Sequence, residues 1–362
     1  ITNVDLENEK KFLFFLNPNL SNLTNSQVDK ISRDSLKNRT IKEIELKNYY
    51  DLTKKDIALV YIDNFISNNI YNNKDDLIKQ LSQFDAVILI RERTQITRTL
   101  LQGLPKLKFI SLFGSCPHID IKACSDHRVL VCAGKRSHTP SFAAAEHTWA
   151  LIMAAEKDIP QQMQNLQNGK WQQGMARGLF GRRLGLYGYG RIAKQVADYA
   201  EAFKMQVEWW GSDQGRARAK ADGRAVAKSR ATFFAKNDIV SVHLRLTAAT
   251  EGVITAADLG KMKPNSLFVN TSRSGLLGSG VLLNALNSGR PGKAAVDVFD
   301  EEPITWQRDE LACHPHIIAT PHIGFVTDDE FEMQFSEVFE QVRSWARGRP
   351  VNMLNPDIWQ VA

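Results

Sequence analysis

Short apolar runs alternate along most of the chain with longer segments whose apolar residues recur at helical spacing. Near the start, the runs at residues 11–16 and 57–62 predict strands, and the spacing at 25–36 and 74–83 predicts helices. Further strands are predicted at residues 86–90, 109–113, 184–187, 207–210, 239–244, 267–270, 294–298 and 317–319. Such short runs are typical of strands buried on both faces of a parallel sheet. The pattern therefore predicts an α/β fold with doubly wound parallel sheets.

Two longer helical segments flank the second series of strands. Residues 141–155 are apolar on most faces, which is typical of a buried helix that connects two domains. Residues 328–347 have an amphipathic pattern that ends at Gly348 and Pro350, residue types that stop helices. Because 362 residues exceed the usual size of one domain, we expect two domains.

The composition and net charge of the chain limit the classes of protein to which it can belong. Apolar residues make up 43% of the chain, and no apolar run approaches the ~20 residues of a membrane span. The early run at residues 12–16 is too short for a signal-peptide core, so we expect a cytoplasmic protein without a membrane partner. The net charge of +6 comes from basic residues scattered among acidic ones, which suits a small anionic substrate at least as well as nucleic acid. Because the sequence contains no recognised nucleic-acid-binding module, we expect no nucleic-acid partner. The cysteines form no CxxC pair and no group with histidine, so we expect neither a disulfide framework nor a metal site.

A glycine-rich turn follows the predicted strand at residues 184–187. The turn has the form GxGxxA, with an amphipathic helix after it and another strand at residue 207. Gly188 permits a tight turn, Gly190 lets the backbone approach a pyrophosphate, and Ala193 allows close packing of helix on strand. The helix N-terminus supplies N–H groups for the phosphates. The residues expected at a dinucleotide cofactor are Gly188, Tyr189, Gly190, Arg191 and Ile192.

The residues at the end of the next strand are compatible with either of two cofactors, NAD or NADP. An acid that binds the adenosine ribose is expected roughly 20 residues after the turn. Gly211 occupies that position, and the nearest carboxylate is Asp213. Asp213 at the ribose hydroxyls favours NAD, whereas Ser212, Arg216 and Arg218 around a 2′-phosphate would favour NADP. We predict NAD, with NADP as the alternative. The two arginines are also typical of a solvated helix face.

Several motifs in a fixed order carry a resemblance to a known family. They are AAAEHTWALIMA at 143–154, GLYGYGRIA at 185–193, VSVHLRLT at 240–247, VNTSRSG at 269–275, AVDVFDEEP at 295–303 and TPHIG at 320–324. On these motifs the chain, from about residue 84 to 357, resembles the D-isomer-specific 2-hydroxyacid dehydrogenases. The resemblance implies hydride transfer between a nicotinamide cofactor and C2 of a small D-2-hydroxy or 2-keto acid.

The resemblance also implies a catalytic group of Arg273, Glu302 and His322. Each of these residues follows a predicted strand, where open α/β sheets bind ligands. Reduction of a keto acid needs an acid that titrates near neutrality at the new alkoxide, which suits histidine. A carboxylate partner would favour the imidazolium and orient the ring. The guanidinium fork suits bidentate binding of the substrate carboxylate and polarisation of the keto oxygen.

Further site residues come from the same resemblance. Arg91, Gly114 and Ser115 are expected to contact the substrate, although the loop FGSCPHID has fewer glycines than the family's form. The residues expected to line the cofactor pocket are His243, Leu244, Thr250, Thr271, Ser272, Asp297 and Gly324. Arg245 occupies a position where proline is usual, and Ser274 one where glycine is usual. These departures leave the catalytic group intact.

The resemblance implies a Rossmann NAD-binding domain, residues 156–326, inserted into a flavodoxin-like substrate domain, residues 1–155 and 327–362. Catalysis is expected in the cleft between them, with closure that brings Arg91 toward Arg273. The family usually forms homodimers, so a homodimer is expected. The alternative function is an NAD(H)-sensing, corepressor-like interaction protein, because the same fold serves that role.

Overall fold

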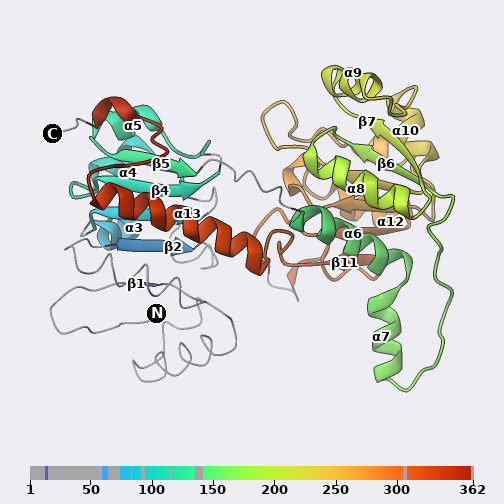
Figure 1. Cartoon of the computed structure of the whole chain (residues 1–362). Coiled ribbons are helices and arrows are strands. Elements are labelled where there is room, and N and C mark those ends of the chain that lie inside the picture. Colours follow the sequence, from blue (N-terminus) through green and yellow to red (C-terminus); the bar gives the residue numbers. More distant parts are fainter. Residues whose placement is uncertain are drawn as a thin grey trace. The chain divides into compact units, whose positions relative to one another are not determined.

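The computed structural model describes residues 13–14, 59–63, 74–82, 84–90, 94–114, 116–134, 142–302, 304 and 308–359 (Figure 1). The predicted helix at 25–36 and the predicted site residues Arg91 and Ser115 lie outside this part of the chain. The chain divides into two compact units. The first unit comprises Ile1–Pro140 and Asp328–Ala362, and the second comprises Ser141–Thr327.

The first unit contains a 5-stranded parallel sheet. Its order is β1 (Leu13–Phe14), β2 (Leu59–Asp63), β3 (Ala86–Ile90), β4 (Phe109–Phe113) and β5 (Leu130–Gly134). The helices among the described residues of this unit are α3 (Lys74–Leu81), α4 (Arg98–Gln102), α5 (Ile121–Asp126) and α13 (Asp328–Ala346). The order of the described strands follows the sequence, whereas a flavodoxin-like sheet exchanges its first two strands.

Strands β3, β4 and β5 are buried on both faces of the sheet, as uninterrupted apolar runs predict. Val87 and Leu89 of β3 pack with residues of α3, α4 and α5, whereas Ile88 belongs to a cluster with Val338 of α13. Successive side chains of a strand point to opposite faces, so β3, β4 and β5 each contribute residues to both clusters. The end of the chain therefore completes the first unit, on the face of the sheet opposite α3, α4 and α5.

The second unit contains a 6-stranded parallel sheet in the order β7-β6-β8-β9-β10-β11. The strands are β6 (Arg183–Tyr187), β7 (Gln206–Trp210), β8 (Ile239–Val242), β9 (Leu267–Asn270), β10 (Lys293–Val296) and β11 (Ile317–Ala319). The helices are α6 (Ala143–Glu156), α7 (Ile159–Gln167), α8 (Arg191–Ala202), α9 (Asp213–Ala221), α10 (Arg230–Lys236), α11 (Ala256–Leu259) and α12 (Val281–Asn287). The chain leaves β6 toward β7 and then returns to the other side of β6 as β8. This reversal creates the crevice at the strand ends where open α/β sheets bind ligands.

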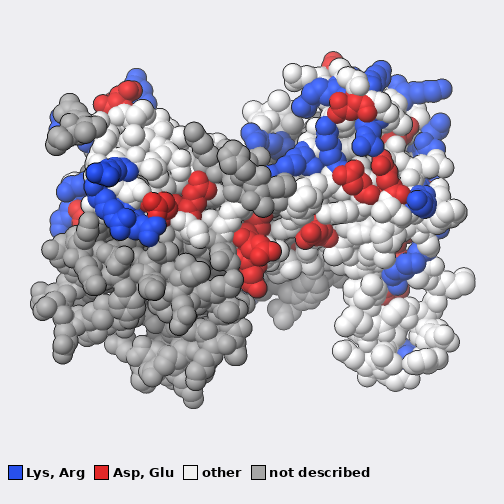
Figure 2. Space-filling model, in the orientation of Figure 1, with Lys and Arg blue, Asp and Glu red and all other residues white. Residues whose placement is uncertain are grey.

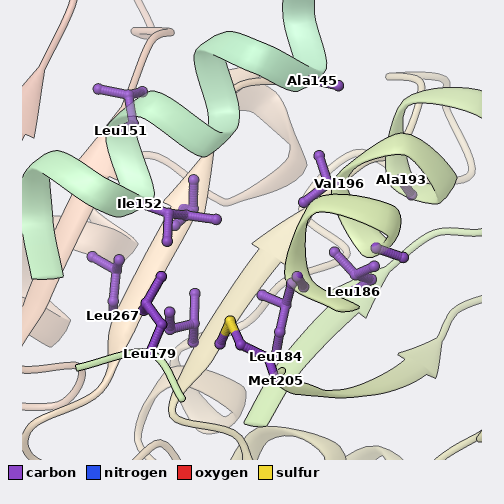
Figure 3. Packing of buried hydrophobic residues seen from close by; sticks show 14 of the residues in the cluster. Ala145, Leu151, Ile152, Leu179, Leu184, Leu186, Ala193, Val196, Met205 and Leu267 are labelled. Carbon is purple, nitrogen blue, oxygen red and sulfur yellow. The ribbon is translucent and has the colours of Figure 1, made fainter. Parts of the chain in front are cut away.

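Helix α6 packs in the core of the second unit. Leu151 and Ile152 of α6 lie in one cluster with Leu184 of β6 and Val196 of α8 (Figure 3). The expected domain boundary after residue 155 therefore differs from the division after Pro140. The helix was expected to connect two domains because its apolar residues occupy most faces, yet those faces pack within the second unit.

The structure confirms an α/β fold of parallel sheets. Two predicted strands end earlier than expected, because β8 stops at Val242 and β10 stops at Val296. His243 and Asp297 therefore belong to the turns that follow the strands. Among the described residues, no helix combines the length and the apolar character that crossing a bilayer requires.

Candidate active site

The glycine-rich turn follows β6 at the point where the sheet order reverses. Gly188 has φ +116° and donates its backbone N–H to the carbonyl of Trp210 at 2.8 Å. A Cβ added at Gly188 would lie 2.3 Å from the carbonyl oxygen of His243, so the position requires glycine. A Cβ added at Gly190 meets no atom of the described residues within 4 Å, so the space before the turn is open. Gly190 is also the N-cap of α8, and no side chain caps the first N–H groups of that helix. The turn therefore fits the pyrophosphate of a dinucleotide.

The side chains beside the two glycines have different surroundings. Tyr189 is buried, its ring packs edge-on against Trp209, and its hydroxyl donates to Asp222. Arg191 is exposed and Ile192 is half-buried in the first turn of α8. The Tyr189 side chain thus anchors the turn to the unit's core, which leaves the backbone to face a phosphate.

The predicted catalytic residues Glu302 and His322 lie side by side. Nδ1 of His322 and Oε2 of Glu302 are 2.6 Å apart, and their side chains are 17% and 20% exposed. The other carboxylate oxygen, Oε1, accepts a hydrogen bond from the backbone N–H of Phe299 at 3.1 Å. The carboxylate therefore has a fixed orientation, and it fixes the imidazole in turn.

A second carboxylate holds the backbone of the loop that carries His322. Asp297 is 1% exposed. Its Oδ1 accepts hydrogen bonds from the Thr320 hydroxyl at 2.6 Å and from the Ile323 N–H at 2.9 Å, and its Oδ2 accepts from the Gly324 N–H at 2.8 Å. We expected Asp297 and Gly324 to line the cofactor pocket, and the structure shows that they bind each other. Sequence reasoning did not indicate this contact, because the partners are far apart in the chain.

Hydrogen bonds also set the charge of Asp297. Burial alone would raise the pKa of this carboxyl group. Hydrogen bonds from His147, from Thr320 and from the backbone N–H groups of Ile323 and Gly324 outweigh burial, so the net pKa lies below its usual value. Asp297 is therefore an anion at neutral pH. Nε2 of His147, on α6, lies 3.3 Å from Oδ1 of Asp297 and 2.9 Å from the Thr320 hydroxyl oxygen.

Arg273 lies in the turn after β9. Its side chain is exposed, and Nη1 donates to the carbonyl oxygen of Ser272 at 2.7 Å. The turn is held by Asn270, whose side chain donates to the Arg273 carbonyl at 2.9 Å and accepts from the Ser272 N–H at 3.0 Å. The Ser272 hydroxyl donates to the Val242 carbonyl at 2.8 Å, which ties this turn to the end of β8. Sequence reasoning missed the role of Asn270, although it lies inside the VNTSRSG motif.

The other predicted cofactor residues occupy turns at the same edge of the sheet. His243 follows β8, its ring Nε2 lies 2.9 Å from the Ser241 hydroxyl, and burial lowers its pKa to about 4. The imidazole is therefore neutral at physiological pH. Leu244, the next residue, is half-buried. The Thr250 hydroxyl donates to the Arg245 carbonyl at 2.7 Å and closes the loop that follows.

The remaining predicted residues are tied to α6 or lie in other turns. The hydroxyl of Thr271 is 2.7 Å from that of Thr148, a residue of α6 that the sequence analysis had not assigned. Ser212 begins α9, and its Oγ accepts from the Gly215 N–H at 3.2 Å. Asp213 is an exposed residue of that helix. In the first unit, Gly114 follows β4 with φ +90°.

In the part of the chain that the structure describes, no group of histidine, cysteine and carboxylate side chains has the arrangement of a metal site. The site in the second unit thus consists of a turn suited to phosphate, an imidazole–carboxylate pair and an exposed guanidinium. All of them follow the carboxyl ends of strands of one parallel sheet.

Comparison with known proteins agrees with this arrangement. Residues 149–324 match a family model described as "D-isomer specific 2-hydroxyacid dehydrogenase, NAD binding domain". The D-3-phosphoglycerate dehydrogenase of Bacillus subtilis is 33% identical over 285 residues, which make up 78% of this chain and 53% of that protein. This chain therefore spans about half the length of that relative.

Two further relatives are matched over most of their length. The hydroxypyruvate reductase of Thermotoga maritima is 30% identical over 273 residues, 74% of this chain and 87% of that protein. A crystal structure of a phosphoglycerate oxidoreductase from Vibrio cholerae has 40% sequence identity and a TM-score of 0.71, and covers 78% of this chain and 90% of that one. The chain belongs to the D-isomer specific 2-hydroxyacid dehydrogenase family, and its second unit is the family's NAD-binding domain.

Proposed function

We propose that this chain is an oxidoreductase that transfers a hydride between a nicotinamide cofactor and C2 of a small D-2-hydroxy acid or the matching 2-keto acid. The observation that carries the proposal is the 2.6 Å contact between Nδ1 of His322 and Oε2 of Glu302. This pair lies at the sheet edge that also bears the phosphate-binding turn at Gly188 and Gly190. An acid–base pair beside a dinucleotide turn is the minimum that such a reaction requires.

His322 acts as the acid in keto-acid reduction and as the base in hydroxy-acid oxidation. In reduction, Nε2 of the imidazolium gives its proton to the oxygen on C2, while a nicotinamide held at the Gly188–Gly190 turn would supply the hydride to the carbon. Glu302 accepts the Nδ1–H hydrogen bond, which orients the ring so that Nε2 faces the substrate oxygen. In oxidation the proton returns from the C2 hydroxyl to Nε2.

Arg273 binds the acid group of the substrate. Its guanidinium is exposed beside the turn after β9, and its fixed fork of donors matches a carboxylate. A guanidinium near the keto oxygen also stabilises the negative charge that develops there during hydride addition. The names of the relatives point to substrates of this class, because the Thermotoga protein is called a hydroxypyruvate reductase and the Bacillus protein a D-3-phosphoglycerate dehydrogenase.

The chain forms a homodimer through an apolar arm of the second unit. The arm consists of α7 and the segment after it, which extend beyond the sheet in Figure 1. Its large side chains are exposed by 43% at Ile159, 59% at Met163, 61% at Leu166, 74% at Trp171, 98% at Met175 and 81% at Phe180. Exposed apolar groups at this density mark a protein interface. The homodimerisation that the family resemblance implies makes a second copy of the chain the expected partner.

The function is tested with a panel of 2-keto acids, following the loss of nicotinamide absorbance with NADH and NADPH. His322→Ala is expected to lower kcat by about 10²- to 10⁴-fold, whereas the Kd for the coenzyme stays nearly unchanged. His316→Ala is a matched control, because His316 is also a histidine near β11 but is exposed. Undiminished turnover in His322→Ala, or no turnover of any 2-keto acid by the wild type, would overturn the proposal.

A further inference from the structure

The strand end that meets the adenosine ribose in Rossmann domains lacks an acid in this chain. Strand β7 ends at Trp210, and Gly211 follows with φ +155°. A Cβ added at Gly211 would lie 3.6 Å from the backbone nitrogen of Gly188. The position therefore faces the first glycine of the phosphate-binding turn, where a carboxylate would select NAD by binding the ribose 2′-hydroxyl. With glycine there, this selection against a 2′-phosphate is missing.

The nearest carboxylate, that of Asp213, does not take over the role of the missing acid. Asp213 lies in the first turn of α9, and its side chain is 94% exposed. It forms an ion pair with Arg216, which offsets its charge. A carboxylate so exposed repels a nearby phosphate only weakly, because solvent screens it.

The charged side chain beside this strand end is the guanidinium of Arg216 instead of a carboxylate. The guanidinium carbon of Arg216 lies 4.2 Å from the ring centroid of Trp210, the last residue of β7. The arginine side chain is only 28% exposed, so it rests on the indole. Arg218 is exposed and lies two positions further along α9, where the helix turns it to a different face. The stacking therefore singles out Arg216 among the basic residues of this helix.

The surroundings favour an anion. Figure 2 shows blue Lys and Arg side chains gathered over the part of the second unit where α9 and α10 lie. Besides Arg216, α9 carries Arg218 and Lys220. The Ser212 oxygen accepts a hydrogen bond from Gly215 N–H, which leaves the hydroxyl hydrogen to be donated elsewhere. A positive surface of this kind raises the local concentration of a phosphorylated ligand.

We propose that the adenosine end of the cofactor site accepts a 2′-phosphate, so that NADPH binds at least as tightly as NADH, and that Arg216 is the specificity-determining residue. The guanidinium fork binds the phosphate while its face stays on Trp210, and the Ser212 hydroxyl donates a further hydrogen bond. In exchange, Arg216 gives up its ion pair with Asp213. The proposal rests on the dinucleotide site of the proposed function.

The test is equilibrium binding without any keto acid. The wild-type chain is titrated with NADPH and NADH, and nicotinamide fluorescence gives each Kd. Arg216→Ala is expected to weaken NADPH binding by about 10- to 100-fold, the usual effect of losing a charge-assisted contact. Its Kd for NADH should stay within about twofold of the wild-type value. Arg216→Lys should fall between the two, because it keeps the charge and loses the fork.

Arg218→Ala is the matched control, since it removes the same charge from the same helix, and it should leave the ratio of the two Kd values unchanged. Wild-type binding of NADH more than about tenfold tighter than NADPH would overturn the proposal, as would an equal loss of both coenzymes in Arg216→Ala. Binding of neither coenzyme would overturn the proposed function as well. Selective binding of NADH would overturn the 2′-phosphate proposal alone.

Discussion

Replacing the Asp297 carboxylate by an amide tests whether this group holds the loop that carries His322 in place. In Asp297→Asn one carboxylate oxygen becomes an NH2 group, which cannot accept a hydrogen bond. In one amide orientation that group faces the Gly324 N–H, and in the other it faces the Ile323 N–H. At least one buried backbone donor therefore loses its acceptor, whichever way the amide turns.

The expected loss of stability follows from the burial of this group. A hydrogen bond to a charged acceptor contributes about 1.5–3 kcal/mol, and a buried donor left unpaired costs about 1–3 kcal/mol. Because Asp297 is 1% exposed, water does not replace the lost acceptor. We expect the free energy of unfolding to fall by about 2–5 kcal/mol. Turnover should fall at least about tenfold, since the loop that positions His322 loosens.

The same variant has a pH signature. The pKa of Asp297 is lowered in the folded protein, because hydrogen bonds outweigh the opposing effect of burial. A carboxyl group with a lowered folded pKa contributes stability that is fully present above the unfolded pKa, ~3.9, and is lost as the pH falls through the folded value. The difference in stability between wild type and Asp297→Asn should therefore be constant near neutrality and shrink as the pH falls below about 4.

Urea unfolding followed by tryptophan fluorescence at several pH values measures both effects, and steady-state kinetics measures turnover. Asp300→Asn is the matched control, because Asp300 is an exposed acid of the same motif. It should change the unfolding free energy by no more than about 0.5 kcal/mol. If Asp297→Asn matched that control in stability and the wild type in kcat, the loop-holding role would be wrong.

Three further predictions concern the turn at Gly188, the His243 ring and the apolar arm. Gly188→Ala should abolish NADH binding in equilibrium titrations, because its Cβ would lie 2.3 Å from the His243 carbonyl oxygen, and wild-type affinity in this variant would contradict the geometry. Burial lowers the pKa of His243 to about 4, so its neutral ring contributes stability that is present above pH ~6.5 and is lost as the pH falls toward 4. His243→Gln should remove up to about 3 kcal/mol of that pH dependence, and identical unfolding profiles would refute it. If the proposed homodimer forms through the arm, Met163→Glu combined with Leu166→Glu should halve the mass measured by light scattering while Gln161→Glu does not, and an unchanged mass would exclude the arm as the interface.

The strands could largely be predicted from the sequence because parallel strands buried on both faces are continuous apolar runs. The runs at 86–90, 109–113 and 267–270 coincide with β3, β4 and β9. Strand β5 was missed, although it pairs with β4 and is buried along its whole length. Its sequence LVCAG ends in small residues that are poor strand formers, so position in the sheet, not propensity, makes it a strand.

The candidate site, like the strands, could be predicted from the sequence only in part. Glu302 and His322 were proposed from their motifs, and the structure brings the two side chains to 2.6 Å from each other. The residues that hold them could not be predicted, since the bond between Asp297 and Gly324 joins two turns, and the contact of His147 with Thr320 joins a helix to a distant loop. Such partners are decided by which segments the sheet brings together, which single-sequence periodicity does not encode.

The backbone of His322 explains why its loop needs two attachments. His322 has φ +56°, a left-handed conformation that costs a residue with a side chain about 1–3 kcal/mol. The segment that follows β10 offsets this strain at both of its ends: Asp297 binds the backbone of the loop, and Glu302 binds the imidazole. Because backbone and ring are each held by a carboxylate of the same segment, the residue cannot relax to a more common conformation without breaking hydrogen bonds to a buried anion. The strained residue is thus held in the place where the proposed proton transfer would occur.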